Sequence, residues 1–233
     1  MLNLIGMVLT AALMMLLVNA LTSSMEVSRA AKVAIATVTG VWIGLAAAAA
    51  ETGWLAIARR VPVVGLFVIV PLLAAAVAAA WPPARQAMLS IPMTVMVALN
   101  IVRVFGFLFL LLAAEGRLSG PFPYSAAWGD IITGVAAVAV LWLLKEGTAR
   151  YTAAMAAWNL FGTADLVLAI VLGITSSDGS PLQVFPGPGS DAMQEVPWSF
   201  IPTVLVPIWL ILHGIIAVRL RRANLGHAAV VPA

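Results

Sequence analysis

The stretch that decides the fold is residues 62–81, PVVGLFVIVPLLAAAVAAAW, in which no side chain is charged. A helix needs about 20 predominantly apolar residues to cross a bilayer. Six further stretches are similarly apolar, and none contains more than one or two ionisable groups: residues 2–21, 33–52, 88–114, 124–144, 151–173 and 198–220. The pattern predicts an all-α integral membrane protein, a bundle of seven transmembrane helices that forms one domain over residues 1–222.

The composition of the whole chain points to the same class. The 233 residues are 63% hydrophobic and only 9% charged, and their mean hydropathy is +1.09, whereas a soluble domain is about 25% charged. The apolar runs are continuous, so they do not fit the alternating strands of a membrane β-barrel. We therefore expect the lipid bilayer to be the main partner of this chain.

The residue inventory excludes several chemistries. There is no cysteine, which removes disulfides, thiolate metal sites and cysteine nucleophiles. The two histidines, His213 and His227, are too few for a multi-histidine metal centre. The sequence pI is near 10.0, but the basic residues are spread over short loops and form no stripe of the kind that binds nucleic acid. We expect no metal, no cofactor and no nucleic-acid partner.

Basic residues in the short loops predict the orientation, because cytoplasmic loops carry the excess of Lys and Arg. If the N-terminus is outside, eight basic residues fall on the cytoplasmic side: Arg29, Lys32, Arg85, Lys145, Arg150, Arg219, Arg221 and Arg222. Only three fall outside: Arg59, Arg60 and Arg117. This excess predicts an outer N-terminus and a cytoplasmic C-terminus. The Arg59–Arg60 pair dissents, and Trp54 and Leu55 before it suggest a short segment that lies in the membrane interface.

Only one connection between the predicted spans is long. Residues 174–197 are rich in Gly, Pro, Ser and acidic residues, and the prolines and glycines prevent a continuous helix. We expect an external loop, which either covers a cavity as a lid or is a flexible connection. Residues 223–233 are expected to form a short cytoplasmic tail.

Four ionisable residues lie inside the predicted spans: Arg103, Asp130, Asp165 and His213. A charged group at mid-bilayer costs at least about 2.5–3.5 kcal/mol and is a functional hypothesis by default. At about 1.5 Å per residue from the cytoplasmic helix ends, Arg103 and Asp165 both lie about 22 Å deep. We therefore predict a buried Arg103–Asp165 pair. Asp130, about 9 Å below the outer end of its helix, is within reach of the same guanidinium, which can hold two carboxylates.

Polar side chains extend this series toward the cytoplasm. Asn100 precedes Arg103 by three residues and shares its helix face, while Asn159 and His213 lie about 13 Å and 9 Å from the cytoplasmic surface. Together with Asp130 and Asp165, these residues are candidates for a substrate or proton pathway. The alternative is a structural ion pair that fixes helix register, with His213 hydrogen-bonded to a neighbouring helix.

Two prolines interrupt the last predicted span. Pro202 and Pro207 each free the carbonyl four residues earlier, which belongs to Trp198 and Thr203 respectively. Freed carbonyls line ion or substrate sites in transporters, although they also occur in membrane helices that only bend. Both interpretations stay open at this point.

Small residues are frequent in the predicted spans. In lipid, helices associate by close backbone approach at small residues. We therefore expect helix packing to explain most of the glycines in the spans, among them Gly40, Gly44, Gly129, Gly134 and Gly162.

Three classes of function remain. A small transporter or channel-like protein for a small solute or protons best accounts for the mid-bilayer charges. A non-catalytic subunit or assembly factor would have a second copy or another membrane protein as its partner. An enzyme acting on a lipid or isoprenoid is the third class, but the chain has no aspartate-rich metal motif and no serine beside a base, so no catalytic residue is predicted. The expected location is a bacterial cytoplasmic (inner) membrane.

Overall fold

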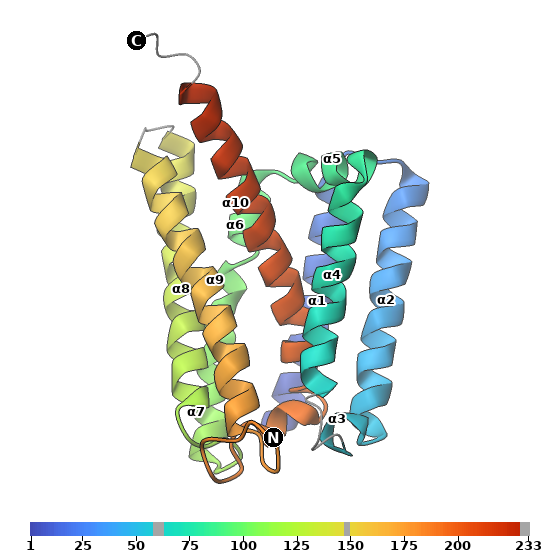
Figure 1. Ribbon diagram of the computed structural model, residues 1–233, viewed down its shortest axis with the longest axis vertical. Helices are drawn as coiled ribbons and strands as arrows, with labels where there is room; N and C mark the ends of the chain where they lie inside the picture. Colours follow the sequence, from blue (N-terminus) through green and yellow to red (C-terminus); the bar gives the residue numbers. More distant parts are fainter. Residues whose placement is uncertain (58–62, 147–149, 229–233) are drawn as a thin grey trace.

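The computed structural model describes residues 1–57, 63–146 and 150–228. Within these ranges the chain is helical and contains no strand. Seven of its helices are long and apolar enough to cross a membrane. They run side by side along the long axis of the molecule, with the N-terminus at one end of the bundle (Figure 1). The prediction of an all-helical chain with seven such helices is confirmed.

The helical elements of the described residues occur along the chain in the following order. They are α1 (Leu2–Ser24), α2 (Arg29–Glu51), α3 (Trp54–Ile57), α4 (Val63–Ala80), α5 (Pro82–Ser90), α6 (Met93–Ala98), η1 (Ile101–Gly106), α7 (Phe107–Ala114), α8 (Phe122–Glu146), α9 (Arg150–Ser176), η2 (Asp191–Gln194), η3 (Ile201–Leu205) and α10 (Val206–Ala228).

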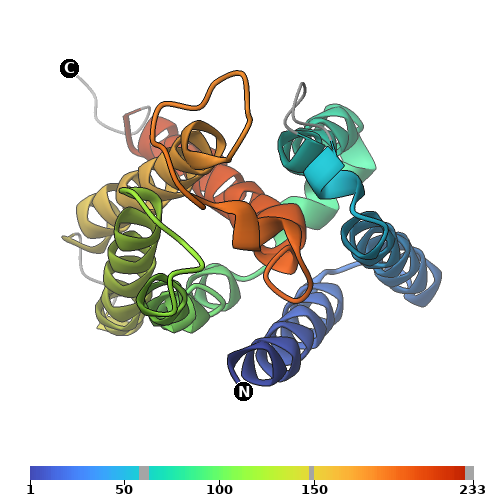
Figure 2. The same ribbon diagram turned by 90° about the horizontal axis from the view of Figure 1, so that it is seen from below.

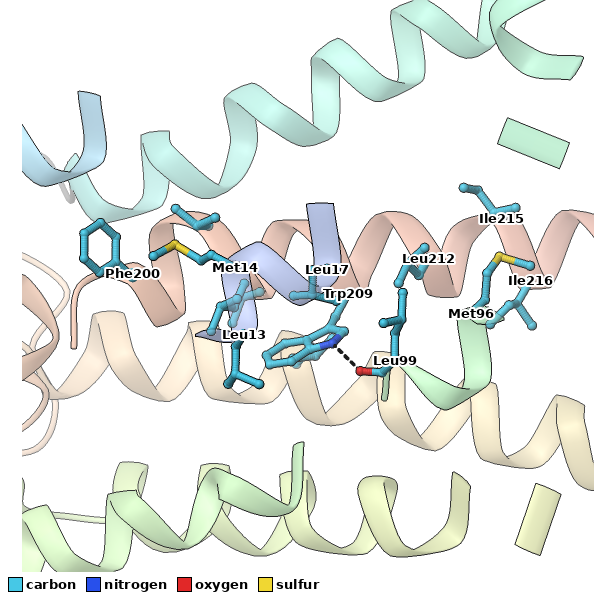
Figure 3. Close-up of a cluster of buried hydrophobic side chains, with 14 of the residues drawn as sticks. Leu13, Met14, Leu17, Met96, Leu99, Phe200, Trp209, Leu212, Ile215 and Ile216 are labelled. Carbon is cyan, nitrogen blue, oxygen red and sulfur yellow. Dashed lines mark hydrogen bonds between the residues drawn. The ribbon is translucent and has the colours of Figure 1, made fainter. Parts of the chain in front are cut away.

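The inclined helix α10 forms the centre of the bundle. It contacts α9 on one side and α4 on the other, and Figure 2 shows it between these two groups of helices. Side chains from α1, α6 and α10 meet in a buried apolar cluster that includes Leu17, Met96 and Leu212. In that cluster Trp209 donates a hydrogen bond from Nε1 to the carbonyl oxygen of Leu99, at 3.3 Å (Figure 3).

The fourth span differs from its predicted form. The sequence predicted one helix over residues 88–114, but a separate helix α5 ends at Ser90 and the span begins at Met93, just after Pro92. Proline ends or starts helices because it lacks an amide hydrogen and restricts the residue before it. Inside the span, α6 and α7 are joined by η1, a tighter 3₁₀ segment that carries Arg103.

The seventh span begins with a π-helical segment, η3, followed by α10. The carbonyl of Thr203, which Pro207 was predicted to free, accepts a hydrogen bond from the indole Nε1 of Trp42 in α2, at 2.9 Å. A proline-freed carbonyl is often satisfied by a neighbouring helix. This carbonyl is therefore used to attach α2 to the bundle, which argues against a role as a ligand for an ion.

The long connection is a folded loop at the end of the bundle where the N-terminus lies (Figure 1). It begins after Ser176, since α9 extends three residues beyond the predicted end at 173. The backbone N–H of Ser119 donates to the carbonyl oxygen of Gly189, and the backbone N–H of Gly189 donates to Oγ of Ser119. Ser190 Oγ donates to the carbonyl of Gly173. These bonds hold the loop against α9 and the segment before α8.

The predicted interfacial segment is the short helix α3, in which Trp54 is exposed and Leu55 is buried. Arg59 and Arg60, which the sequence analysis placed after it, lie outside the described residues. The same holds for the side chain of His227.

Candidate functional site

Arg103 is at the centre of the candidate site and is 1% exposed. Its backbone lies in η1, against α8. The tight approach of these two elements depends on Gly134, where a Cβ atom would come within 2.8 Å of the backbone nitrogen of Val104. The 3₁₀ segment and the glycine together hold the arginine inside the bundle rather than at its surface.

The guanidinium of Arg103 binds two carboxylates from two different helices. Its Nε donates to Oδ1 of Asp130 in α8, at 2.7 Å, and its Nη2 donates to Oδ2 of Asp165 in α9. Both aspartates are buried. The predicted Arg103–Asp165 pair is present, and the same guanidinium also holds Asp130.

The third nitrogen of the guanidinium faces α9 and α10. Nη1 of Arg103 donates to the carbonyl of Gly162, at 3.4 Å, and lies 3.3 Å from Nε2 of His213. Arginine has donors only, so Nε2 of this imidazole is the acceptor and Nδ1 carries the hydrogen. Nδ1 then donates to Oδ1 of Asn159, at 2.8 Å, and Nδ2 of Asn159 donates back to the carbonyl of His213, at 3.2 Å. The tautomer of His213 is thus set by its two partners.

Aromatic rings enclose the charged groups. The indole of Trp209 lies 5.7 Å from the Cζ atom of Arg103, a distance at which the ring face attracts the cation. The ring of Trp158 lies 5.2 Å from that of His213, and its Nε1 donates to the carbonyl of Thr133. These rings lower the polarity around the cluster, which strengthens its electrostatic interactions.

Formal charges in this cluster do not balance. Arg103 supplies one positive charge, Asp130 and Asp165 supply two negative charges, and His213 accepts a hydrogen bond as a neutral ring. One negative charge is therefore in excess unless a proton or a cation joins the cluster. A structural ion pair with Arg103 would need only one carboxylate. Such a pair does not explain why a second buried carboxylate is present.

Glycines of α8, α9 and η1 leave room for this cluster. A Cβ atom at Gly129 would overlap the carboxylate of Asp165, and one at Gly162 would come within 2.7 Å of the His213 ring. At Gly106 it would lie 2.5 Å from Cβ of Asp130. By contrast, nothing lies within 4 Å of a Cβ atom at Gly40 or Gly44. Gly40 and Gly44 therefore do not pack within the described chain, because their faces of α2 are exposed, whereas Gly129, Gly134 and Gly162 do.

A cavity of about 100 Å³ lies beside the cluster, and we call it the outer cavity. Side chains of α4, α7, α8, α9 and the long loop surround it, and Asp130 is among them. A smaller cavity of about 30 Å³ on the α1 side of the bundle is lined by Arg103 and Asp130. Asp130 therefore lines both cavities.

Comparison with protein families gave one match. The model of a family described as a domain of unknown function (DUF8737) matches residues 60–221, which is more than half of the chain. The chain belongs to this family. The matched region contains Arg103, Asp130, Asp165 and His213, whereas α1 and α2 lie outside it. Comparisons with curated proteins and with solved structures gave no match.

In this family member, five of the six predicted site residues form one compact cluster instead of a series in order of depth: Arg103, Asp130, Asn159, Asp165 and His213. His213 was expected well below Arg103, yet the two side chains are hydrogen-bonded. The depth estimates assumed straight, regular helices perpendicular to the membrane, whereas α10 is inclined (Figure 1) and the fourth span starts at Met93 and contains η1.

Asn100 is the predicted site residue that does not join the cluster. It is fully buried, and its Nδ2 donates to the carbonyl of Met96. Its Oδ1 has no hydrogen-bond partner within the described part of the chain. The expected helix face shared with Arg103 assumed α-helical geometry, but Asn100 stands where α6 gives way to η1.

Two contributors to the site were not foreseen. The carbonyl of Gly162 and the ring of Trp209 both contact the guanidinium. The sequence contained one usable signal for Trp209, since this tryptophan lies deeper in its span than the others. No sequence signal points to a backbone carbonyl in the middle of a regular helix.

Proposed function

We propose that the chain crosses a membrane seven times and is a small transporter or channel-like protein for a small solute or protons. The N-terminus is outside and the C-terminus is cytoplasmic, in a bacterial cytoplasmic membrane. The cluster of Arg103, Asp130, Asp165, His213 and Asn159 is its intramembrane polar site.

The observation that carries this proposal is a buried cluster in which two carboxylates share one guanidinium beside a cavity. Uncompensated charge inside a bundle is costly, and in membrane proteins such groups mark ion, proton and substrate pathways. A second carboxylate that can take up a proton or a cation gives the cluster two charge states. Two charge states are what a carrier needs to couple a solute or a proton to a conformational change.

The arrangement of the cavities supports access from one side at a time. The outer cavity reaches Asp130 from the end of the bundle where the long loop lies. Toward the other end, the buried side chains of Met155, Leu212 and Ile216 fill the interior. This conformation therefore has its larger cavity on the proposed outer side of the cluster, and transport requires movement of the helices around α10.

The orientation rests on the distribution of charge over the two ends. Arg29, Lys32, Arg85 and Arg219 belong to the end of the bundle opposite the long loop, where Arg219 donates to the carbonyl of Ile91. At the loop end, Arg117 contacts Asn3 and Glu195. The positive excess of the first end favours a cytoplasmic location.

The test is proton flux into proteoliposomes that contain a pH-sensitive dye, driven by a potassium diffusion potential. We expect dye acidification above that of empty vesicles, and loss of this flux in Asp165→Asn. Glu26→Gln is the matched control, because it neutralises an exposed carboxylate far from the cluster and should leave the flux unchanged. Equal flux in the wild type, in Asp165→Asn and in empty vesicles would contradict proton transport.

Absence of proton flux in the wild type would favour the alternative that the chain is a non-catalytic subunit or assembly factor. Native mass spectrometry of the gently extracted protein then decides between the two. A stoichiometric partner chain in the spectrum would replace the transport proposal, whereas a bound small molecule on a lone chain would retain it.

A further inference from the structure

The outer cavity has an apolar body and an acidic inner end. Most of the side chains around it are apolar, among them Val68 of α4, Phe109 of α7, Phe122 of α8 and Ala169 of α9. Polar residues of the cavity wall come from the long loop at one end and from Asp130 at the other. A cavity with an apolar wall and a few convergent polar groups is the usual form of a small-molecule site.

The carboxylate of Asp130 has capacity left for a ligand. Its Oδ1 accepts the hydrogen bond from Nε of Arg103, and within the described residues its Oδ2 accepts none. Arg103 itself does not line the outer cavity. Among the described residues, a molecule in the outer cavity therefore meets Asp130 and not Arg103.

Within the described part of the chain, the charged side chains that line the outer cavity are all acidic. Its charged members among the described residues are Asp130 and Asp178, and no basic side chain lines it there. The cluster behind Asp130 adds a second carboxylate and one guanidinium. Phe109 and Phe122, whose ring centroids are 5.8 Å apart, provide aromatic surface that attracts cations.

We propose that the outer cavity binds a small organic cation: a protonated amine whose compact apolar body lies among Val68, Phe109 and Ala169 and whose ammonium group donates to the carboxylate of Asp130. A bound monocation neutralises the excess charge of the cluster. A cavity of roughly 150 Å³ is known to bind benzene, so this somewhat smaller cavity suits a body of about that size. The inference gives the substrate class of the proposed transporter. Transport of the amine depends on the proposed function, whereas binding of the amine does not.

The test uses the detergent-solubilised full chain and three probes of nearly the same shape: 2-phenylethylammonium, 2-phenylethanol and phenylacetate. Isothermal titration calorimetry measures their affinities at neutral pH. We expect the amine to bind at least tenfold more tightly than the alcohol, and phenylacetate to bind most weakly. Equal affinity for amine and alcohol, or a preference for phenylacetate, would overturn the proposal.

Two substitutions locate the binding. Asp130→Asn should lower the affinity for the amine at least tenfold and change that for the alcohol much less. Ala169→Phe should fill the cavity and abolish binding of both, whereas Val167→Phe, on the exposed side of the same helix, should bind as the wild type does. If Asp130→Asn does not fold, the Ala169→Phe and Val167→Phe pair still decides, and unchanged amine binding in Ala169→Phe would refute the site.

These experiments test the binding proposal and the transport proposal separately. Amine binding without flux or uptake in proteoliposomes would sustain the site and remove the transport proposal. Proton flux that depends on Asp165, in a protein that binds none of the three probes, would support the transport proposal. It would refute the proposal that the outer cavity binds an organic cation.

Discussion

Arg103 places two of its nitrogens on carboxylates of different helices, and the third on His213 and on a backbone carbonyl. Each contact joins η1 to α8, α9 or α10, so one side chain connects four elements. A planar guanidinium with donors on three sides is suited to this role, and a lysine ammonium is not.

Neutralising the two kinds of charge in the cluster should have very different effects. Arg103→Gln leaves two buried carboxylates without a cation and should cost about 3–5 kcal/mol of unfolding free energy. Asp165→Asn leaves one guanidinium opposite one carboxylate, so no buried charge is left uncompensated and we expect a much smaller change than for Arg103→Gln. The measurement is reversible unfolding in mixed micelles with increasing SDS.

The double variant Arg103→Gln/Asp165→Asn checks the coupling between the two residues. It leaves one uncompensated carboxylate instead of two, so it should recover part of the loss seen in Arg103→Gln. Strictly additive free energies would mean that the two side chains do not interact.

Gly129 should tolerate no side chain. Because a Cβ atom there overlaps the carboxylate of Asp165, Gly129→Ala should displace this aspartate from Arg103 and cost about 1–3 kcal/mol, as overpacking does. Gly44→Ala is the matched control, since its Cβ has open space and alanine favours a helix by up to about 1 kcal/mol over glycine. Both are measured by thermal unfolding in one detergent, and a lower midpoint for Gly44→Ala than for Gly129→Ala would contradict the packing argument.

Irregular segments interrupt the two spans that supply Arg103 and His213. The 3₁₀ segment η1 carries Arg103, and the π-helical segment η3 precedes α10. Such segments leave backbone groups that the regular helix would use, and neighbouring helices satisfy them. The bond from Trp42 to the carbonyl of Thr203 is the clearest example.

Replacement of Trp42 by phenylalanine should isolate the contribution of this bond. Trp42→Phe removes the indole N–H but keeps an aromatic ring next to Phe67, whose ring centroid lies 5.0 Å away. We expect a loss of about 1 kcal/mol, the usual net value of such a hydrogen bond, measured by SDS unfolding. Trp142→Phe, at a highly exposed position of α8, should change the unfolding free energy little. An equal loss in the two variants would mean that the hydrogen bond does not contribute.

At the scale of the whole molecule, the bundle has one end tied together by loops and one end that carries most of the basic residues. The long loop, Arg117 and the N-terminus meet at the first end. At the second end, the backbone N–H of Glu26 in the α1–α2 connection donates to Oγ of Ser90 in α5, and Arg219 of α10 donates to the carbonyl of Ile91. The proposed orientation places the first end outside the cell.

Single cysteines should report this orientation directly, because the chain has none of its own. Phe185→Cys in the long loop should react with a membrane-impermeant maleimide on intact cells. Gln86→Cys, exposed on α5 at the opposite end, should react only after the cells are opened. The reverse pattern would mean that the N-terminus is cytoplasmic.

Sequence by itself determined the class of fold and the residues that matter electrostatically. The number of long apolar helices follows from runs of about 20 residues, and this signal is local, so it can be read without the tertiary structure. Charges inside such runs are rare and costly, and for that reason Arg103, Asp130, Asp165 and His213 could be chosen before any geometry was known.

Only the tertiary structure decided how these residues meet. Arg103 and His213 are brought together by the inclination of α10 and by η1. Neither of these two features can be predicted from the hydropathy of the sequence. Whether a glycine packs or faces outward depends on its neighbours, which is why Gly129 makes room for Asp165 while Gly44 faces open space. The outer cavity is likewise formed by residues of α4, α7, α8, α9 and the long loop. Apolar runs define helices because burial in lipid acts on each segment alone, whereas a site is formed by side chains from several segments and depends on how those segments pack.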